Sequence, residues 1–131
     1  MMRRLLLYAW ALPTTLPGLA LVAIGLLTGG RATLVNGVLE AHGGIISRLL
    51  RHCVLLKGGA SAMTLGHVVL GQDRQSLDIS REHERIHVRQ CERWGPLFIP
   101  AYLLASAYAW ITGRHPYRDN PFEREAYEQA G

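Results

Sequence analysis

The stretch "SREHERIHVRQCERWG", residues 80–95, has the composition of a single polar helix whose two ends are both marked in the sequence. Ser80 is a favoured N-cap residue. Gly95 suits the position just after a helix, and Pro96 cannot continue one. The sequence therefore predicts a helix from Arg81 to Trp94.

The predicted helix contains an HExxH pattern, formed by His83, Glu84 and His87. Residues four apart lie on one face of a helix, so the two histidines can direct ring nitrogens at one metal ion. Neutral imidazoles are good zinc ligands, and a neighbouring glutamate can take a proton from a water that the metal makes more acidic. The pattern thus indicates a hydrolytic metal site, but two histidines alone do not complete one.

A third protein ligand is usual in catalytic zinc sites, and the segment "DNPFEREAYE", residues 119–128, supplies three glutamates. Glu123 and Glu125 are both candidates. Asn120 and Pro121 favour a helix start, however, and Glu123 then falls where a glutamate can close a capping box. The sequence leaves open which glutamate is the ligand, and whether Glu123 only starts a helix.

The combination of HExxH with a later Glu-x-x-Ala, residues 123–126, resembles the gluzincin type of zincin metallopeptidase. The likeness is to the membrane-embedded kind, typified by CAAX prenyl proteases and bacterial heat-shock membrane proteases. It also resembles short bacterial membrane proteins with HExxH and a downstream "NPFE"-like segment. The resemblance implies one Zn²⁺ bound by His83, His87 and Glu123, with Glu84 as the catalytic base acting on a peptide or protein substrate.

The resemblance also implies supporting residues. In that family Asp directly follows Glu-x-x-Ala and supports a ligand histidine, whereas this chain has Tyr127 there. His115, Tyr117 and Tyr127 are candidates to donate a hydrogen bond to an oxyanion or to support a ligand. Zincins bind the substrate backbone along a strand before the site helix, which here implies an edge strand that includes the three residues Leu65, Gly66 and His67.

The N-terminal segment carries no charge from residue 5 to residue 30. At about 1.5 Å per residue it is long enough to cross a hydrocarbon core of about 30 Å. Pro13 and Pro17 predict a kinked or irregular first half. We interpret residues 1–30 as a transmembrane anchor, with a cleaved signal peptide and a buried core helix as alternatives. Membrane lipid is then an expected partner.

A second apolar run covers residues 97–113 and is marginal for a membrane crossing, with Pro100 inside it. A full crossing would separate Glu123 from His83 by about 30 Å and abolish the metal site. A buried or membrane-dipping helix is therefore the interpretation that agrees with the site.

The segment after the N-terminal run predicts a hairpin and a short helix. Asn36-Gly37 favours a type I′ turn, which places strands at residues 33–35 and 38–42. The segment "IISRLLRHCVLL", residues 45–56, has apolar residues at helical intervals. Residues 62–69 alternate like a single strand, and residues 71–78 are expected to form a loop.

These elements predict an α+β fold: a minimal zincin-like domain over residues 31–131, with short strands, a site helix and a ligand helix. The net charge of +4 comes from singly scattered basic residues, which excludes a nucleic-acid patch. The two cysteines show no CxxC spacing, which excludes a redox motif or zinc ribbon.

Three functions remain open for this chain. The first is a membrane-bound zinc metallopeptidase, and the second is a zinc-binding membrane protein with a structural or partner-binding role. In the third there is no metal, and the predicted helix meets anionic lipid through four arginines spaced four apart. These arginines are Arg81, Arg85, Arg89 and Arg93.

Overall fold

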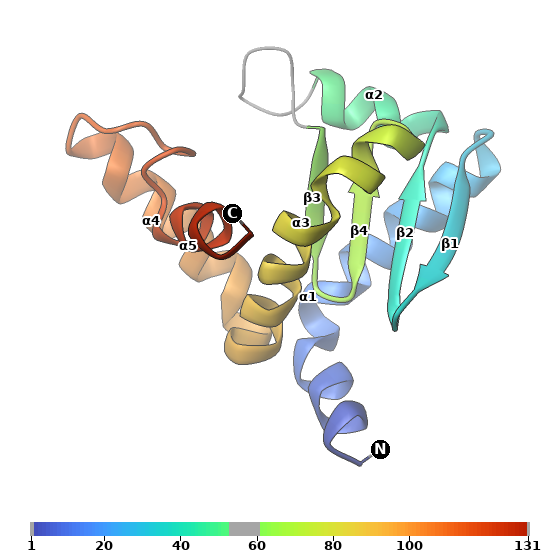
Figure 1. Ribbon diagram of the computed structural model, residues 1–131, viewed down its shortest axis with the longest axis horizontal. Coiled ribbons are helices and arrows are strands. Elements are labelled where there is room, and N and C mark those ends of the chain that lie inside the picture. The colour runs from blue at the N-terminus through green and yellow to red at the C-terminus, as the bar shows by residue number, and fades with distance from the viewer. Residues whose placement is uncertain (1, 53–60, 131) are drawn as a thin grey trace.

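The computed structural model describes residues 2–52 and 61–130 and shows an α+β fold with a small four-stranded sheet (Figure 1). The elements in chain order are α1 (Met2–Leu27), β1 (Arg31–Val35), β2 (Val38–His42), α2 (Gly44–His52), β3 (Ala62–Leu65), β4 (Val68–Gly71), α3 (Arg74–Trp94), the short 3-10 helix η1 (Gly95–Leu97), α4 (Phe98–Ile111) and α5 (Pro121–Ala130). The α+β fold class is thus confirmed.

The sheet has the strand order β1-β2-β4-β3, so β1 and β3 are its two edges. The predicted hairpin is confirmed: β1 and β2 are antiparallel, and Asn36 and Gly37 have φ values of 49° and 81°. The central strands β2 and β4 are parallel, with Leu39 opposite Val68. The predicted helix after the hairpin is present as α2, and its expected continuation over residues 53–56 lies outside the described residues.

Helices cover both faces of the sheet (Figure 1). Alternate residues of β4 point to opposite faces. Val68 and Leu70 pack with Val22 of α1 and with α2, whereas Val69 packs with Val88 of α3. The sheet therefore lies between α1 and α2 on one side and α3 on the other.

The prediction of one strand over residues 62–69 was wrong, because the segment is a tight hairpin of β3 and β4. Gly66 has a φ of +64°, and a Cβ atom there would lie 2.1 Å from the Thr15 hydroxyl oxygen of α1. The chain turns at Gly66 and His67, so only Leu65 of the three predicted edge residues belongs to the edge strand.

Helix α3 begins earlier than predicted, and residues 74–78 are helical rather than a loop. Asp73 is the N-cap, since its carboxylate accepts a hydrogen bond from the Ser76 amide at 2.7 Å. Ser80 lies inside the helix, and its hydroxyl donates to the Ser76 carbonyl oxygen. The predicted end at Gly95 is confirmed, with a φ of +58°.

The N-terminal apolar segment forms one continuous helix, α1, with Pro13 and Pro17 inside it. This helix packs on the sheet, and Val22 belongs to a core cluster together with residues of β2, α2 and β4. The predicted anchor, residues 1–30, is thus in contact with the rest of the fold. By length and composition, Met2–Leu27 and Arg74–Ile111 could each cross a membrane.

Candidate metal centre

Helix α3 presents His83, Glu84 and His87 on the side that faces α5 and the end of β3. Glu84 and His87 are buried, and His83 is half-buried. Ligand atoms of the three residues lie within 4.8 Å of one another, a grouping that could hold a metal ion. The HExxH pattern therefore lies in the interior of the fold and not on a solvated helix face.

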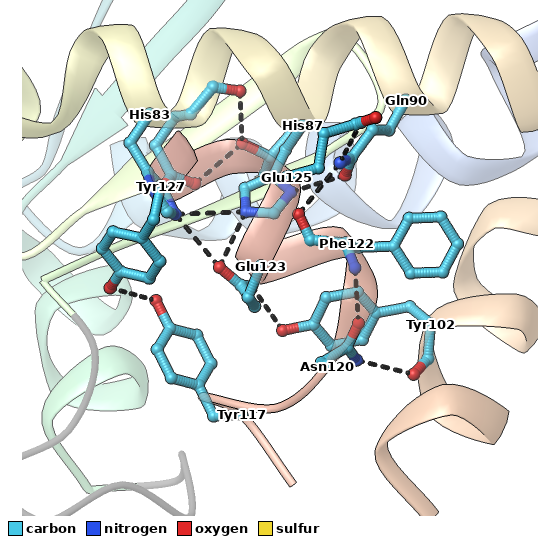
Figure 2. A network of polar contacts seen from close by, with 12 residues as sticks. His83, His87, Gln90, Tyr102, Tyr117, Asn120, Phe122, Glu123, Glu125 and Tyr127 are labelled. Carbon is cyan, nitrogen blue, oxygen red and sulfur yellow. Dashed lines mark hydrogen bonds and ion pairs between the residues drawn. The ribbon is translucent and has the colours of Figure 1, made fainter. Parts of the chain in front are cut away.

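Helix α5 brings Glu123 to the two histidines, as Figure 2 shows. The Glu123 Oε1 atom lies 3.0 Å from His83 Nε2 and 2.9 Å from His87 Nε2, and the two nitrogens are 3.3 Å apart. Asn120 caps this helix by accepting a hydrogen bond from the Phe122 amide. The Glu123 carboxylate is thus directed at the histidines, and not at the helix start as in a capping box.

The second candidate, Glu125, points elsewhere. Its Oε1 atom accepts hydrogen bonds from Gln90 Nε2 at 2.8 Å and from Arg93 at 3.4 Å. Of the two glutamates that the sequence left open, the structure therefore places Glu123 next to the histidines.

Of the four arginines that the sequence spaces four apart on α3, three are used within the fold. Arg81 forms a bidentate ion pair with the buried carboxylate of Glu40 on β2. Arg85 donates to the backbone oxygen of Asn36, and Arg93 to the carboxylate of Glu125. These arginines therefore do not form a free basic stripe along α3 that could bind anionic lipid.

The donor set can be compared with what zinc requires. Zinc binds imidazole nitrogen and carboxylate oxygen at about 2.0–2.2 Å in a tetrahedral shell, so neighbouring ligand atoms lie about 3.3–3.5 Å apart. The three atoms of His83, His87 and Glu123 lie 2.9–3.3 Å apart, within a few tenths of an ångström of this spacing. The spacing of these three atoms is therefore compatible with a metal ion held by three protein ligands, and zinc meets this requirement.

The orientation of the Gln90 side chain also supports a metal site, because it determines which His87 nitrogen carries a proton. The Gln90 amide nitrogen lies 2.9 Å from the Phe122 carbonyl oxygen and 2.8 Å from Glu125 Oε1, and both atoms are acceptors. Its oxygen therefore faces His87 Nδ1 at 2.8 Å and accepts a proton from it. A neutral His87 then directs a bare Nε2 at Glu123 Oε1, so a proton or a cation must lie between them.

Burial and charge act in opposite directions on this pair. Burial alone would raise the pKa of Glu123, but hydrogen bonds from His83, His87 and Tyr102 outweigh it and hold the pKa near 2. Burial alone would lower the pKa of His87, and the Glu123 carboxylate outweighs it and raises the pKa. The carboxylate is thus ionised in the interior, where a cation would compensate its charge.

Replacing Gln90 with Leu is expected to weaken zinc binding by about 10-fold to 100-fold, because His87 loses the partner that orients its ring. Gln90 is 1% exposed, so unpaired groups left behind should also lower the free energy of unfolding by about 1–3 kcal/mol. Chelator competition measures the first effect and denaturant titration the second. Gln75→Leu, at an exposed position of the same helix, is the control. Equal zinc affinity in both variants would contradict this role.

Glu84 lies beside the three candidate ligands and bonds to the edge strand. The Thr64 hydroxyl of β3 donates to Glu84 Oε1 at 2.9 Å, and Glu84 Oε2 is 3.8 Å from His83 Nε2. Burial raises the pKa of Glu84. The charges of His87 and His83 and the hydrogen bond from Thr64 lower it, but they offset only part of the effect of burial. A carboxylate whose pKa is raised above its ordinary value binds a proton more readily, which suits a group that accepts and then returns one.

Tyr102 of α4 is a site residue that the sequence reasoning missed. Its hydroxyl donates to Glu123 Oε2, so Glu123 has one oxygen bound by a tyrosine and one directed at the histidines. Asn120 connects the same two helices by donating to the Tyr102 carbonyl oxygen and to Ser106. The sequence feature that could have indicated Tyr102 is its hydroxyl group, which stands within the otherwise apolar run of residues 97–113.

The three predicted supporting residues lie in different places. The Tyr127 ring packs against His83 at 4.3 Å between centroids, and its hydroxyl contacts that of Tyr117 at 3.0 Å. Within the described residues, His83 Nδ1 is buried without a hydrogen-bond partner. His115 is exposed, and its Nδ1 accepts amide protons from Tyr117 and Arg118 within the loop. His115 is therefore not part of the site.

His67, which the resemblance placed at the substrate edge, faces away from the metal centre. Its Nε2 pairs with Glu92 at 2.9 Å, and its ring lies 4.2 Å from that of Tyr8 on α1. Leu65 instead lines a cavity at the site.

This cavity has a volume of about 440 Å³ and opens beside Glu84, His87 and Glu123. Strand β3 forms one wall and α4 another. Its lining is mainly apolar, with Met63, Leu65, Phe98, Ile99 and Leu103 among its residues. An extended molecule with an apolar group could thus reach the candidate metal centre.

In comparisons with known proteins, no family model, curated protein or solved structure matches the chain.

Proposed function

We propose that this protein is a membrane-associated, zinc-dependent peptidase. The observation that carries the proposal is the convergence of His83 Nε2, His87 Nε2 and Glu123 Oε1 within 3.3 Å, with the buried Glu84 carboxylate beside them. Two imidazoles, one carboxylate and an adjacent acid–base group are the set that metal-assisted hydrolysis uses. The large exposed apolar residues of α1 and α4, such as Leu16, Leu19 and Leu104, support the membrane association.

In this mechanism His83, His87 and Glu123 would hold one zinc ion. When bound there, zinc would supply Lewis acidity, which makes a water more acidic and polarises the carbonyl of the scissile peptide bond. Glu84 takes the proton of the attacking water and returns it to the leaving amine. Thr64, which donates to Glu84 Oε1, holds this carboxylate in place. Tyr102 and Gln90 orient Glu123 and His87.

The geometry of β3 supports an extended peptide as the substrate. Within the described sheet β3 pairs only with β4, so its other edge offers backbone groups for an added strand. Thr64 of this strand bonds to Glu84, which places the strand next to the proposed base. The apolar cavity between β3 and α4 would receive a large apolar side chain of the substrate.

A non-catalytic zinc-binding role is the second candidate. It is favoured by His83 Nδ1, which has no partner in the described residues, and by Tyr127 at the position where resembling enzymes carry Asp. A ligand histidine without such a partner is less firmly oriented. In this case zinc would link α3 to α5 and stabilise the fold without turnover.

The two candidates are separated by incubating detergent-purified, zinc-loaded protein with a peptide library of mixed sequence. We expect cleavage next to large apolar residues, lost after chelation and restored by zinc. Stoichiometric zinc without cleavage of any peptide would contradict the peptidase proposal and favour the structural role.

A further inference from the structure

Helix α1 differs from an ordinary core helix, because it buries its small residues and exposes its large apolar ones. The residues it buries against the fold are mostly small: Ala11, Thr14, Thr15, Gly18, Val22 and Gly25. Its large apolar residues are exposed instead: Leu5, Leu6, Trp10, Leu12, Leu16, Leu19, Ile24, Leu26 and Leu27. A continuous apolar surface of this extent on one helix indicates an interaction with a membrane or a partner.

The rest of the fold contacts α1 along its whole length. Arg4 and Tyr8, near its start, donate to the backbone oxygens of Asn36 and Gly37 in the β1–β2 turn. Thr28, just beyond its end, accepts a hydrogen bond from the Ile45 amide of α2 at 2.9 Å. Arg4 and Thr28 are 24 residues apart, about 36 Å along a helix, which exceeds the hydrocarbon thickness of about 30 Å.

This continuous contact excludes a transmembrane orientation for α1 in the packed fold. If α1 crossed the bilayer, the sheet would cross beside it. The free backbone groups of the edge strand β1 would then lie in hydrocarbon, which membrane proteins do not tolerate. Exposed charges of α3, such as Asp78, Glu82 and Arg89, would lie there too.

Helix α4 leads to the same conclusion. It exposes the large residues Leu103, Leu104, Tyr108, Trp110 and Ile111, and so lacks a protein cover over most of its surface. Its 14 residues span only about 21 Å. Arg114 and Arg118 follow it and are exposed. Inserted end-on, α4 would carry these charges into the bilayer core, whereas a helix lying along the surface keeps them in water.

We infer that α1 and α4 lie flat in one leaflet of a bilayer, so that the protein is attached to one side of the membrane and does not span it. Trp10 of α1 packs against Gly95 of η1, the short 3-10 helix that leads directly into α4. All three tryptophans, Trp10, Trp94 and Trp110, are 40–70% exposed, as suits side chains at a membrane interface. This inference is independent of the peptidase proposal.

Positive charge at the ends of α1 and α4 indicates that the membrane these helices bind contains anionic lipid. Arg3 and Arg4 precede the apolar part of α1, and Arg31 follows it; Arg114 and Arg118 follow α4. All five are exposed. Basic residues around an apolar helix face complement anionic headgroups and favour an in-plane orientation.

Sidedness is the direct test. Single cysteines replace Met2, Arg31 and Arg114 in a Cys53→Ser background, in which the one remaining thiol, Cys91, is 0% exposed. A membrane-impermeant maleimide is applied to right-side-out and to inverted vesicles of the expression host. We expect all three positions to react in the same preparation and none in the other. Reaction of positions 2 and 31 in opposite preparations would show a spanning α1 and overturn the inference.

Vesicle binding tests the surface itself. The double variant Leu16→Glu with Leu19→Glu should bind at least about tenfold more weakly to phosphatidylglycerol-containing vesicles, because two apolar side chains leave the lipid. Ile79→Glu is the matched control, since Ile79 is 77% exposed but lies on α3, across the sheet from α1. Unchanged binding in the double variant would overturn the inference. So would a protein that forms dimers through this surface and does not bind the vesicles.

Discussion

The Glu84→Gln variant is expected to retain about one zinc per chain and to lose peptide hydrolysis by about 10²-fold to 10⁴-fold, the usual contribution of a general base. Glutamine has nearly the same shape as glutamate, and its oxygen can still accept the hydrogen bond from Thr64. It cannot take a proton from water. The change therefore removes the proposed chemistry while the buried neighbourhood of Glu84 is kept.

Zinc content and turnover must be measured on the same preparation, with Glu82→Gln as the control. Glu82 lies two residues away on the same helix and is exposed, so its replacement should leave both quantities unchanged. Glu84 also belongs to the group that could hold a metal ion, although its nearest carboxylate oxygen is 3.8 Å from His83 Nε2. Loss of zinc in Glu84→Gln would make it a ligand, and full turnover would exclude it as the base.

Removal of zinc is expected to lower the melting temperature of the natural chain by at least about 10 °C. Zinc at a thousandfold excess over its dissociation constant stabilises the native state by about 4 kcal/mol, which corresponds to a shift of this size in a chain of this length. Zinc joins α3 to α5 in the proposed site, so the stabilisation depends on the ligands of both helices. His87→Ala should melt at the same temperature with and without the metal.

The matched control for His87→Ala is His52→Ala, at an exposed position near the end of α2. It should keep the full zinc-dependent shift, measured by circular dichroism in detergent. A shift that survives in His87→Ala would show that zinc stabilises the protein through other residues.

Several local features were predictable because their causes lie within a few residues. Asn36-Gly37 specifies a hairpin turn, since both residues tolerate positive φ. Gly95 ends α3 for the same reason. The spacing of His83 and His87 placed both on one helix face, and the structure has both ring nitrogens next to Glu123; their role as metal ligands remains a proposal.

Other features depend on contacts between distant parts of the chain. The turn at Gly66 is needed because Thr15 of α1 occupies the space beside it, and alternation within residues 62–69 carries no sign of this contact. Tyr102 reaches Glu123 only because Asn120 holds α5 against α4. The two alternatives for the third ligand were likewise separable only by tertiary packing, which directs Glu125 to Gln90.

The membrane orientation of the N-terminal segment also depends on contacts with distant parts of the chain, so the sequence alone could not predict it. Its length and lack of charge satisfy the criterion for a transmembrane helix. Sequence length does not show that the small residues, such as Gly18 and Gly25, are the side that packs on the sheet. That packing binds α1 to strands that a bilayer core would not accept, which is why we propose an in-plane orientation.

The central claim is a metal centre built from α3 and α5, and the most direct test is the metal content of the purified protein after zinc loading. The account predicts one zinc per chain, retained in Glu125→Ala and in the exposed control Glu128→Ala, and lost in Glu123→Ala. A natural chain without stoichiometric zinc, or a Glu123→Ala variant that keeps it, would contradict the account.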